Sequence, residues 1–311
     1  MGIIQSCPFC LPENEVRILW EITSKCNLKC KHCLYYSNNK TFEKDLMLDQ
    51  MFSIVDNIKN DSTVKSIWIS GGEPLLFKNL IEIVKKIKSV NIIPSLSTNA
   101  TLINQEYAIE LHNNGIDYVH VSIDGITADV HDKLRGVPGA FDKVMKSIDY
   151  LNNAGINVGA TYIVNEDSID NVKEMVNFAI KKNLKVISFY LVAPIGRGKE
   201  IDFSNENILM DKLINIINDL KEVDTSILKI EFFRSSCNSS EDYLKPGKGY
   251  NFLTISNSGV LGACPWFVKS INDVSSLSLL DHDFIEAKQI VQSSMKEYLS
   301  NRINKLVKCK T

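Results

Sequence analysis

Hydrophobic and polar residues follow two alternating patterns along most of the chain. Six short segments are strand-like: residues 17–23, 66–70, 92–98, 118–124, 157–164 and 186–192. Between and after them, apolar residues recur at helical spacing in residues 80–90, 105–113, 141–154, 170–181 and 205–222. Gly115, Gly155 and Asn183 stand where such helices would end. Strands separated by helices predict βαβ units around a parallel sheet.

The alternation by itself fits either an open doubly wound sheet or a partial barrel. In both architectures, ligands bind at the carboxyl ends of the parallel strands. The pattern changes after about residue 222, and residues 230–268 look irregular, although residues 252–256 and 259–262 could pair as a hairpin. Residues 283–308 predict one amphipathic helix. We therefore expect an N-terminal segment (1–14), an α/β core (15–225) and a smaller C-terminal module (226–311).

Composition narrows the class of protein. The chain has 311 residues, 44% of them hydrophobic and 23% charged, with a formal net charge of −2. This balance argues against nucleic acid or an anionic membrane as a partner, and no apolar run is long enough to span a membrane. Eight cysteines without a secretory segment fit a reducing compartment better than a disulfide framework. We expect a cytoplasmic protein.

Three of the cysteines lie close together, in Cys26-x3-Cys30-x2-Cys33. A structural zinc site usually takes two separated pairs of ligands, so this spacing does not favour one. Three thiolates suit a cubane iron–sulfur cluster, with one sulfur to each of three irons. The fourth iron would then have no protein thiolate and would be an open, reactive position. A non-catalytic zinc or iron–sulfur binding protein remains the alternative.

The cysteine spacing, directly after a first strand, resembles the signature of the radical S-adenosylmethionine (radical SAM) enzymes. The resemblance implies an α/β fold, a partial (β/α)6 TIM-like barrel with a small irregular α+β C-terminal module. It implies a [4Fe–4S] cluster on Cys26, Cys30 and Cys33, with S-adenosylmethionine bound to the open iron. Reductive cleavage of that cofactor gives a 5′-deoxyadenosyl radical that abstracts hydrogen from a substrate. A flavodoxin or ferredoxin would supply the electron.

Further residues match the family segment by segment. Gly71-Gly72-Glu73-Pro74, after the second strand, looks like the segment that holds the methionine amino group, with Glu73 as an added acceptor for the ammonium. Arg135 would pair with the methionine carboxylate, and His32 would shield the cluster. The other implied cofactor contacts are Ser97 and Asn99 at the end of the third strand, Ser122 and Asp124 at the end of the fourth, and Tyr35 and Leu191 against the adenine.

The C-terminal region resembles the SPASM and twitch modules through Gly259-x4-Cys264, with Cys237 upstream. Those modules bind auxiliary iron–sulfur clusters. Only Cys309 follows, where a full SPASM tail carries a dense group of cysteines, so at most one auxiliary cluster is expected. It would use Cys237, Cys264 and Cys309, completed by Cys7, Cys10 or another ligand. Alternatively, Cys237 or Cys264 would donate a hydrogen atom to the substrate radical.

The tail resemblance favours a ribosomal precursor peptide as the substrate, modified by crosslinking, thioether formation or epimerisation. A small molecule in metabolite or cofactor biosynthesis is the alternative substrate. The sequence does not choose the bond that is formed.

Overall fold

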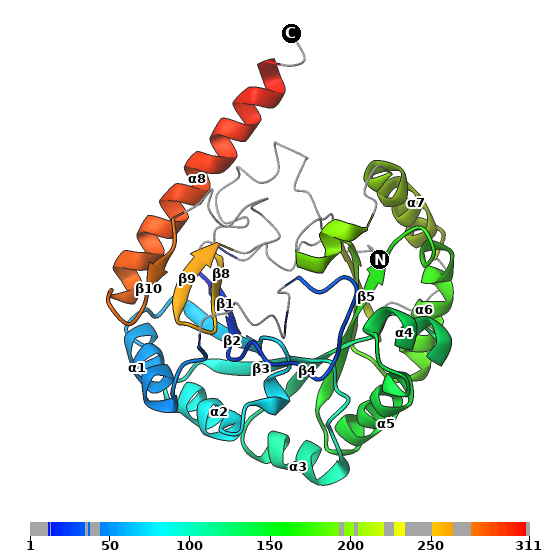
Figure 1. The fold of residues 1–311 in the computed structure, drawn as a ribbon, viewed down its shortest axis with the longest axis horizontal. Helices are drawn as coiled ribbons and strands as arrows, with labels where there is room; N and C mark the ends of the chain where they lie inside the picture. Colours follow the sequence, from blue (N-terminus) through cyan, green and yellow to red (C-terminus); the bar gives the residue numbers. More distant parts are fainter. Residues whose placement is uncertain are drawn as a thin grey trace.

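In the computed structural model, a curved parallel sheet is surrounded by helices (Figure 1). The structure describes residues 12, 14–34, 37, 44–192, 196–201, 205–220, 227–233, 251–263 and 275–308. The strands are β1 (Val16–Glu21), β2 (Val64–Ser70), β3 (Ile93–Thr98), β4 (Tyr118–Ser122), β5 (Asn157–Val164), β6 (Val186–Leu191), β7 (Lys229–Phe233), β8 (Phe252–Ile255), β9 (Val260–Ala263) and β10 (Leu277–Ser278). The helices are α1 (Leu48–Ile58), α2 (Leu80–Ser89), α3 (Gln105–Asn113), α4 (Ala128–Arg135), α5 (Ala140–Asn153), α6 (Val172–Lys181), α7 (Glu206–Asp219) and α8 (Phe284–Lys308), with 3₁₀ segments η1 (Pro74–Leu76), η2 (Ile169–Asn171) and η3 (Gly196–Glu200).

The strand order confirms the predicted α/β fold and extends it. Strands β1 to β7 are neighbours in chain order and parallel. The sheet curves as a partial barrel, and within the described residues it is not closed, because β10 and β7 are its two edges. β7 lies in the region that the sequence predicted to be irregular. That prediction is wrong for residues 230–233, because Lys229–Phe233 pairs with β6 and lengthens the barrel by one strand.

The predicted C-terminal hairpin is also present, and it continues the barrel sheet. β8 pairs in parallel with β1, and β9 returns antiparallel to β8. Gly259 lies at the turn with φ 85°, a left-handed conformation that glycine adopts without strain. β10 then pairs with β9 at the edge of the same ten-stranded sheet.

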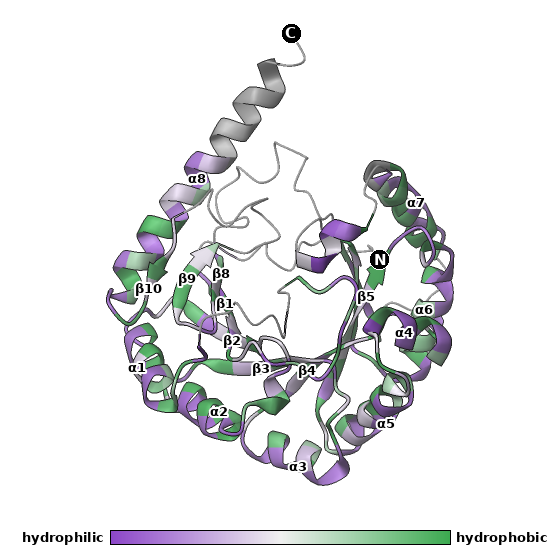
Figure 2. Ribbon diagram, viewed as in Figure 1, coloured by the Kyte–Doolittle hydropathy of each residue, from purple (hydrophilic) through white to green (hydrophobic). Residues whose placement is uncertain are grey.

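The core lies between the sheet and the helices. Alternate strand residues face outward and are buried, such as Ile67 and Ile69 of β2 and Val119 and Val121 of β4. The helices turn apolar stripes toward them and expose polar faces (Figure 2). Helix α1, which the sequence analysis did not identify, buries residues at helical spacing: Met51, Ile54, Val55 and Ile58.

Helix α8 begins against α1 and extends away from the barrel (Figure 1). The Asn57 side chain of α1 caps it, because Asn57 Oδ1 accepts a hydrogen bond of 2.9 Å from Phe284 N. Lys288 forms an ion pair with the buried Asp61. Within the described residues, no helix is both long enough and apolar enough to cross a membrane.

Candidate functional site

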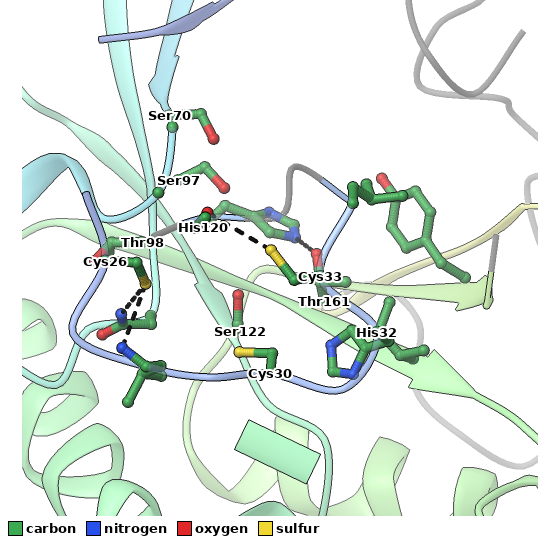
Figure 3. Close-up of a pocket in the computed structure, with 18 of the residues that line it drawn as sticks. Cys26, Cys30, His32, Cys33, Ser70, Ser97, Thr98, His120, Ser122 and Thr161 are labelled. Carbon is green, nitrogen blue, oxygen red and sulfur yellow. Dashed lines mark hydrogen bonds between the residues drawn. The ribbon is translucent and has the colours of Figure 1, made fainter. Parts of the chain in front are cut away.

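A cavity opens at the carboxyl ends of the barrel strands, beneath the loop that follows β1 (Figure 3). We call residues 22–34 the cysteine loop, because it carries the three closely spaced thiols. It contributes Cys26, Leu28, Cys30, His32, Cys33 and Leu34 to the cavity wall. The inward-facing residues of the strands form most of the remaining wall, as parallel α/β folds predict, and residues that follow the strands complete it.

Backbone hydrogen bonds hold the cysteine loop to two other parts of the barrel. Gly72 N donates to Thr23 O at 2.7 Å, and Glu73 N donates to Lys25 O at 2.7 Å. Farther along, Lys29 N and Lys31 N donate to carbonyls in the last turn of α4, at 3.1 and 3.0 Å. These bonds also satisfy helix-end carbonyls that would otherwise have no partner.

The three sulfurs face a common space, and each has a hydrogen-bonding neighbour (Figure 3). Cys26 Sγ accepts from Leu28 N at 3.4 Å and from Asn99 Nδ2 at 3.9 Å. Cys30 Sγ accepts from Arg135 Nη1 at 3.6 Å, and Cys33 Sγ donates to Ser37 Oγ at 3.6 Å. Donors around cluster sulfurs are one of the means by which proteins adjust iron–sulfur centres.

The described residues form no site for a single metal ion. Within the part of the chain that the structure describes, no three His, Cys, Asp or Glu side chains converge closely enough to hold one metal ion. A cubane instead takes one thiolate at each of several separate irons. Burial raises the pKa of the Cys26 thiol to about 11 and also raises the pKa of Cys30. Metal binding at this loop must therefore displace thiol protons.

The two glycines after β2 allow the cavity edge to pack against the cysteine loop. A Cβ on Gly72 would lie 2.2 Å from Lys25 O, and one on Gly71, at φ 138°, would lie 2.4 Å from Thr23 O. Both glycines line the cavity. Their lack of side chains lets the backbone of this segment approach the cysteine loop closely.

Glu73 does not occupy the position that the sequence analysis expected. Its carboxylate is fully buried and accepts hydrogen bonds from Thr98 Oγ1 (2.6 Å), Asn99 N (2.8 Å) and Leu75 N (3.1 Å). Burial raises the pKa of Glu73 to about 7, although these hydrogen bonds oppose the shift. The side chain therefore ties β2 to β3 and is turned away from any ammonium in the cavity. Pro74 begins η1 and is likewise not part of the wall.

A buried charged network lies beside Cys30. Arg135 Nε is 2.6 Å from Asp124 Oδ2, and His32 Nε2 is 3.3 Å from the same oxygen. Asp124 N donates to His131 Nδ1 at 3.2 Å. Burial, the largest single influence, raises the pKa of Asp124, but Arg135, His32 and His131 together with a backbone hydrogen bond outweigh it, and the net shift is downward. The ionised Asp124 lies behind the wall, whereas Arg135 and His32 line the cavity. Asp124 would therefore act on a cofactor through Arg135.

The remaining predicted contacts divide by the direction of their side chains. Ser97, Asn99 and Ser122 line the cavity. Leu191 does not: it lies in the outer core, and its neighbours Tyr190 and Val192 line the cavity instead. Successive residues of a strand face opposite sides of a sheet, so the side chain of Leu191 packs in the outer core and does not face the cavity. The other predicted residues, Tyr35, Cys237, Cys264 and Cys309, lie outside the described residues, as do Cys7 and Cys10.

The inner wall contains a hydrogen-bonded chain that the sequence analysis missed. His120 Nδ1 bonds Tyr118 Oη at 3.0 Å, and His120 Nε2 bonds Thr161 Oγ1 at 2.7 Å. Burial lowers the pKa of His120 to about 4, so its ring is neutral near neutral pH. Trp68 stacks on this ring with centroids 6.0 Å apart. The available signal was the alternation of polar or aromatic residues with buried aliphatic ones in β2 and β4.

Gly159 makes room for this chain, because a Cβ there would lie 2.0 Å from Tyr118 Oη. Arg197, which follows β6 in η3, also lines the cavity and was not predicted.

Comparison with known proteins identifies one family. Residues 20–179, just over half of the chain, match the model of the radical SAM superfamily. The Fe-coproporphyrin III synthase of Methanosarcina barkeri (strain Fusaro / DSM 804) is 31% identical over 195 residues, which are 63% of this chain and 48% of that protein. The mycofactocin maturase MftC of Mycolicibacterium smegmatis (strain ATCC 700084 / mc(2)155) is 30% identical over 185 residues, which are 59% of this chain and 46% of that protein. The chain spans about half the length of the curated relatives it matches.

Among solved structures, SuiB of Streptococcus suis bound to S-adenosylmethionine has a TM-score of 0.73 at 17% identity, covering 91% of this chain and 68% of that one. SuiB has also been solved bound to the precursor peptide SuiA. At this level of identity, the likeness shows a shared fold.

Proposed function

The chain belongs to the radical SAM superfamily, and we propose that it holds a [4Fe–4S] cluster on Cys26, Cys30 and Cys33 and abstracts hydrogen from an organic substrate. The observation that carries the proposal is that the three thiols of one loop line a single cavity that the glycine pair after β2, packed against the same loop, also lines. When bound, the cluster and S-adenosylmethionine supply a 5′-deoxyadenosyl radical.

The residues of the chain would orient the cofactor and protect it from solvent. Gly71 and Gly72 would offer backbone groups to the amino acid part of S-adenosylmethionine. Arg135 would attract its carboxylate, while Asp124 fixes the direction of the guanidinium. Ser97 and Ser122, one from each of two neighbouring strands, would hydrogen-bond the polar groups of the cofactor. Apolar neighbours such as Leu28 and Val192 would exclude water from a reactive radical.

We propose a ribosomal precursor peptide as the first candidate substrate. Two comparisons support this choice: the mycofactocin maturase is a relative, and the fold resembles that of SuiB, which has been solved with a precursor peptide. A small molecule is the second candidate, because the relatives at similar identity include Fe-coproporphyrin III synthase. One auxiliary cluster on Cys237, Cys264 and Cys309 remains a prediction from the C-terminal resemblance, as does hydrogen donation by Cys237 or Cys264.

The first experiment counts iron and measures cofactor cleavage. The chain is purified and reconstituted with iron and sulfide without oxygen, as wild type, as the Cys26/Cys30/Cys33→Ala variant, and as Cys237→Ala. Wild type should bind roughly four irons or more and, with dithionite, convert S-adenosylmethionine to 5′-deoxyadenosine. The triple variant should lose cleavage entirely. A wild-type chain with an intact cluster and no 5′-deoxyadenosine would refute the proposal.

Adding Cys237→Ala to the triple variant tests the auxiliary-cluster prediction separately. Iron that persists in the triple variant but disappears when Cys237 is also replaced would support an auxiliary cluster. Candidate substrates are then compared by mass spectrometry, with precursor peptides encoded near the gene in one arm and porphyrins in the other. Turnover in only one arm selects between the two substrate classes.

A further inference from the structure

The 3₁₀ segment η3 lies against the cysteine loop, although more than 160 residues separate them in sequence. Arg197 makes the connection through three hydrogen bonds. Its Nε donates to Cys30 O at 2.7 Å, its Nη1 donates to Ser37 O at 3.2 Å, and its backbone N donates to Cys33 O at 2.9 Å. All three acceptors are main-chain carbonyls on or just after the cysteine loop.

Gly196 brings the two segments into backbone contact. Its φ of 59° is left-handed, and a Cβ at this residue would lie 2.2 Å from Cys33 O and 2.3 Å from Leu34 O. A side chain here would push η3 away from the loop. This close packing of the two backbones places the Arg197 side chain within hydrogen-bonding distance of Cys30 O.

The two halves of the cysteine loop are held differently. The half around Cys26 is fixed by backbone bonds to the segment after β2. The half from Cys30 to Cys33 is bonded to the end of α4 through Lys29 N and Lys31 N, but the carbonyls of Cys30 and Cys33 both bond Arg197. Within the described residues, Arg197 is thus the side chain that ties this half of the loop to η3.

We propose that Arg197 is a positioning residue that fastens the Cys30–Cys33 half of the loop in the geometry required by the cluster. The role of Arg197 in cluster binding rests on the proposed function, whereas its first test requires no cluster. Arg197 also adds a second guanidinium beside Cys30, which already has Arg135 at its sulfur. Positive charge near an iron–sulfur cluster favours its reduced form and therefore raises its reduction potential.

The first test uses the metal-free chain, so that it does not depend on cluster binding. Hydrogen–deuterium exchange is measured for wild type, Arg197→Gln, Arg197→Lys and Lys199→Gln. Lys199 is exposed on the same 3₁₀ segment, so its variant removes the same charge without touching the loop. In Arg197→Gln, amides of residues 31–34 should exchange about tenfold faster, because bonds to a charged donor are lost. Peptides of β5 should be unchanged, as should all peptides of Lys199→Gln.

The second test uses the reconstituted chain. Arg197→Gln should release iron to a chelator several times faster than wild type and show a lower reduction potential in a redox titration. Arg197→Lys keeps the charge without the planar fork, so its potential should stay near that of wild type while its loop exchange rises. Exchange and iron release equal to wild type in Arg197→Gln would overturn the inference. If Arg197→Gln does not fold, loop exchange in Arg197→Lys that equals the exchange of wild type would overturn the inference.

Failure of the wild type to load iron would count against the proposed function alone and would leave the exchange test of Arg197 standing.

Discussion

The buried ion pair between Asp124 and Arg135 gives the sharpest test of the site's electrostatics. Their side chains are 0% and 8% exposed, and Arg135 Nε lies 2.6 Å from Asp124 Oδ2. At that separation and an effective dielectric constant of about 20, the attraction is about 6 kcal/mol before the cost of desolvation is subtracted. Either Asp124→Asn or Arg135→Gln leaves the other charge buried and uncompensated. Each single variant should therefore lose about 3–5 kcal/mol of unfolding free energy.

The double variant isolates the interaction between the Asp124 and Arg135 charges. With both charges removed, no lone charge is buried, so the loss should be smaller than the sum of the two single losses by about 2–3 kcal/mol. The assay is urea unfolding of the metal-free chain near neutral pH, where the cysteine loop holds no cofactor that could bind the folded state and shift its stability.

An exposed ion pair provides the matched control. Lys182 Nζ lies 2.9 and 3.0 Å from the two oxygens of Asp149, whose side chain is 56% exposed. Asp149→Asn should cost less than about 1 kcal/mol, because solvent screens surface pairs. Single losses at Asp124 and Arg135 as small as the Asp149 control, or strictly additive losses, would refute the reasoning.

Three further predictions concern the neighbouring wall. Gly72→Ala should cost about 1–3 kcal/mol in urea unfolding, since its Cβ would meet Lys25 O at 2.2 Å, whereas Gly262→Ala, with its nearest atoms at 3.8 Å, should cost less than half as much. The pKa of Glu73 is raised from 4.5 to about 7, so this side chain binds its proton more tightly in the folded chain than in the unfolded chain. The stability that the bound proton adds to the folded chain is present below pH 4.5 and is lost as pH rises through 7. Wild type should therefore lose about 3 kcal/mol relative to Glu73→Gln across that window, measured as the difference between their urea midpoints. Tyr118→Phe removes the hydrogen bond to His120 and should cost about 1 kcal/mol in the same assay.

The elements that the sequence predicted well are those with long, regular apolar patterns. All six expected strands are present, and β5 has the predicted bounds because its apolar run is flanked by turn residues on both sides. The cysteine motif and the glycine pair were also predicted, because both depend on residues close together in sequence. β7 was not predicted: Lys229–Phe233 has only five residues, two of them charged, and is a strand because β6 offers it a partner.

Leu191 shows why the direction of a side chain was harder to predict than its element. Strand β6 reads VISFYL, which is apolar on both faces, so the alternation that would mark the inward residues is absent. The structure turns Tyr190 inward and Leu191 toward the helices. Arg197 was missed for a different reason. Its partners are backbone carbonyls far away in sequence, and the only local signal was its place between two glycines, Gly196 and Gly198.

The cavity combines a cation-rich rim with carboxylates kept behind the wall. Arg135 and Arg197 line it, whereas Glu73 and Asp124 are fully buried, each bonded to residues of the rim. Because each carboxylate is occupied by donors or by a guanidinium, it fixes geometry without presenting negative charge to the cavity. A thiolate-bound cluster carries negative charge, so this distribution lowers the electrostatic cost of placing it at the cysteine loop. Neutralising Arg135 while Asp124 remains would reverse that balance, which is why stability and cluster potential should fall together in Arg135→Gln.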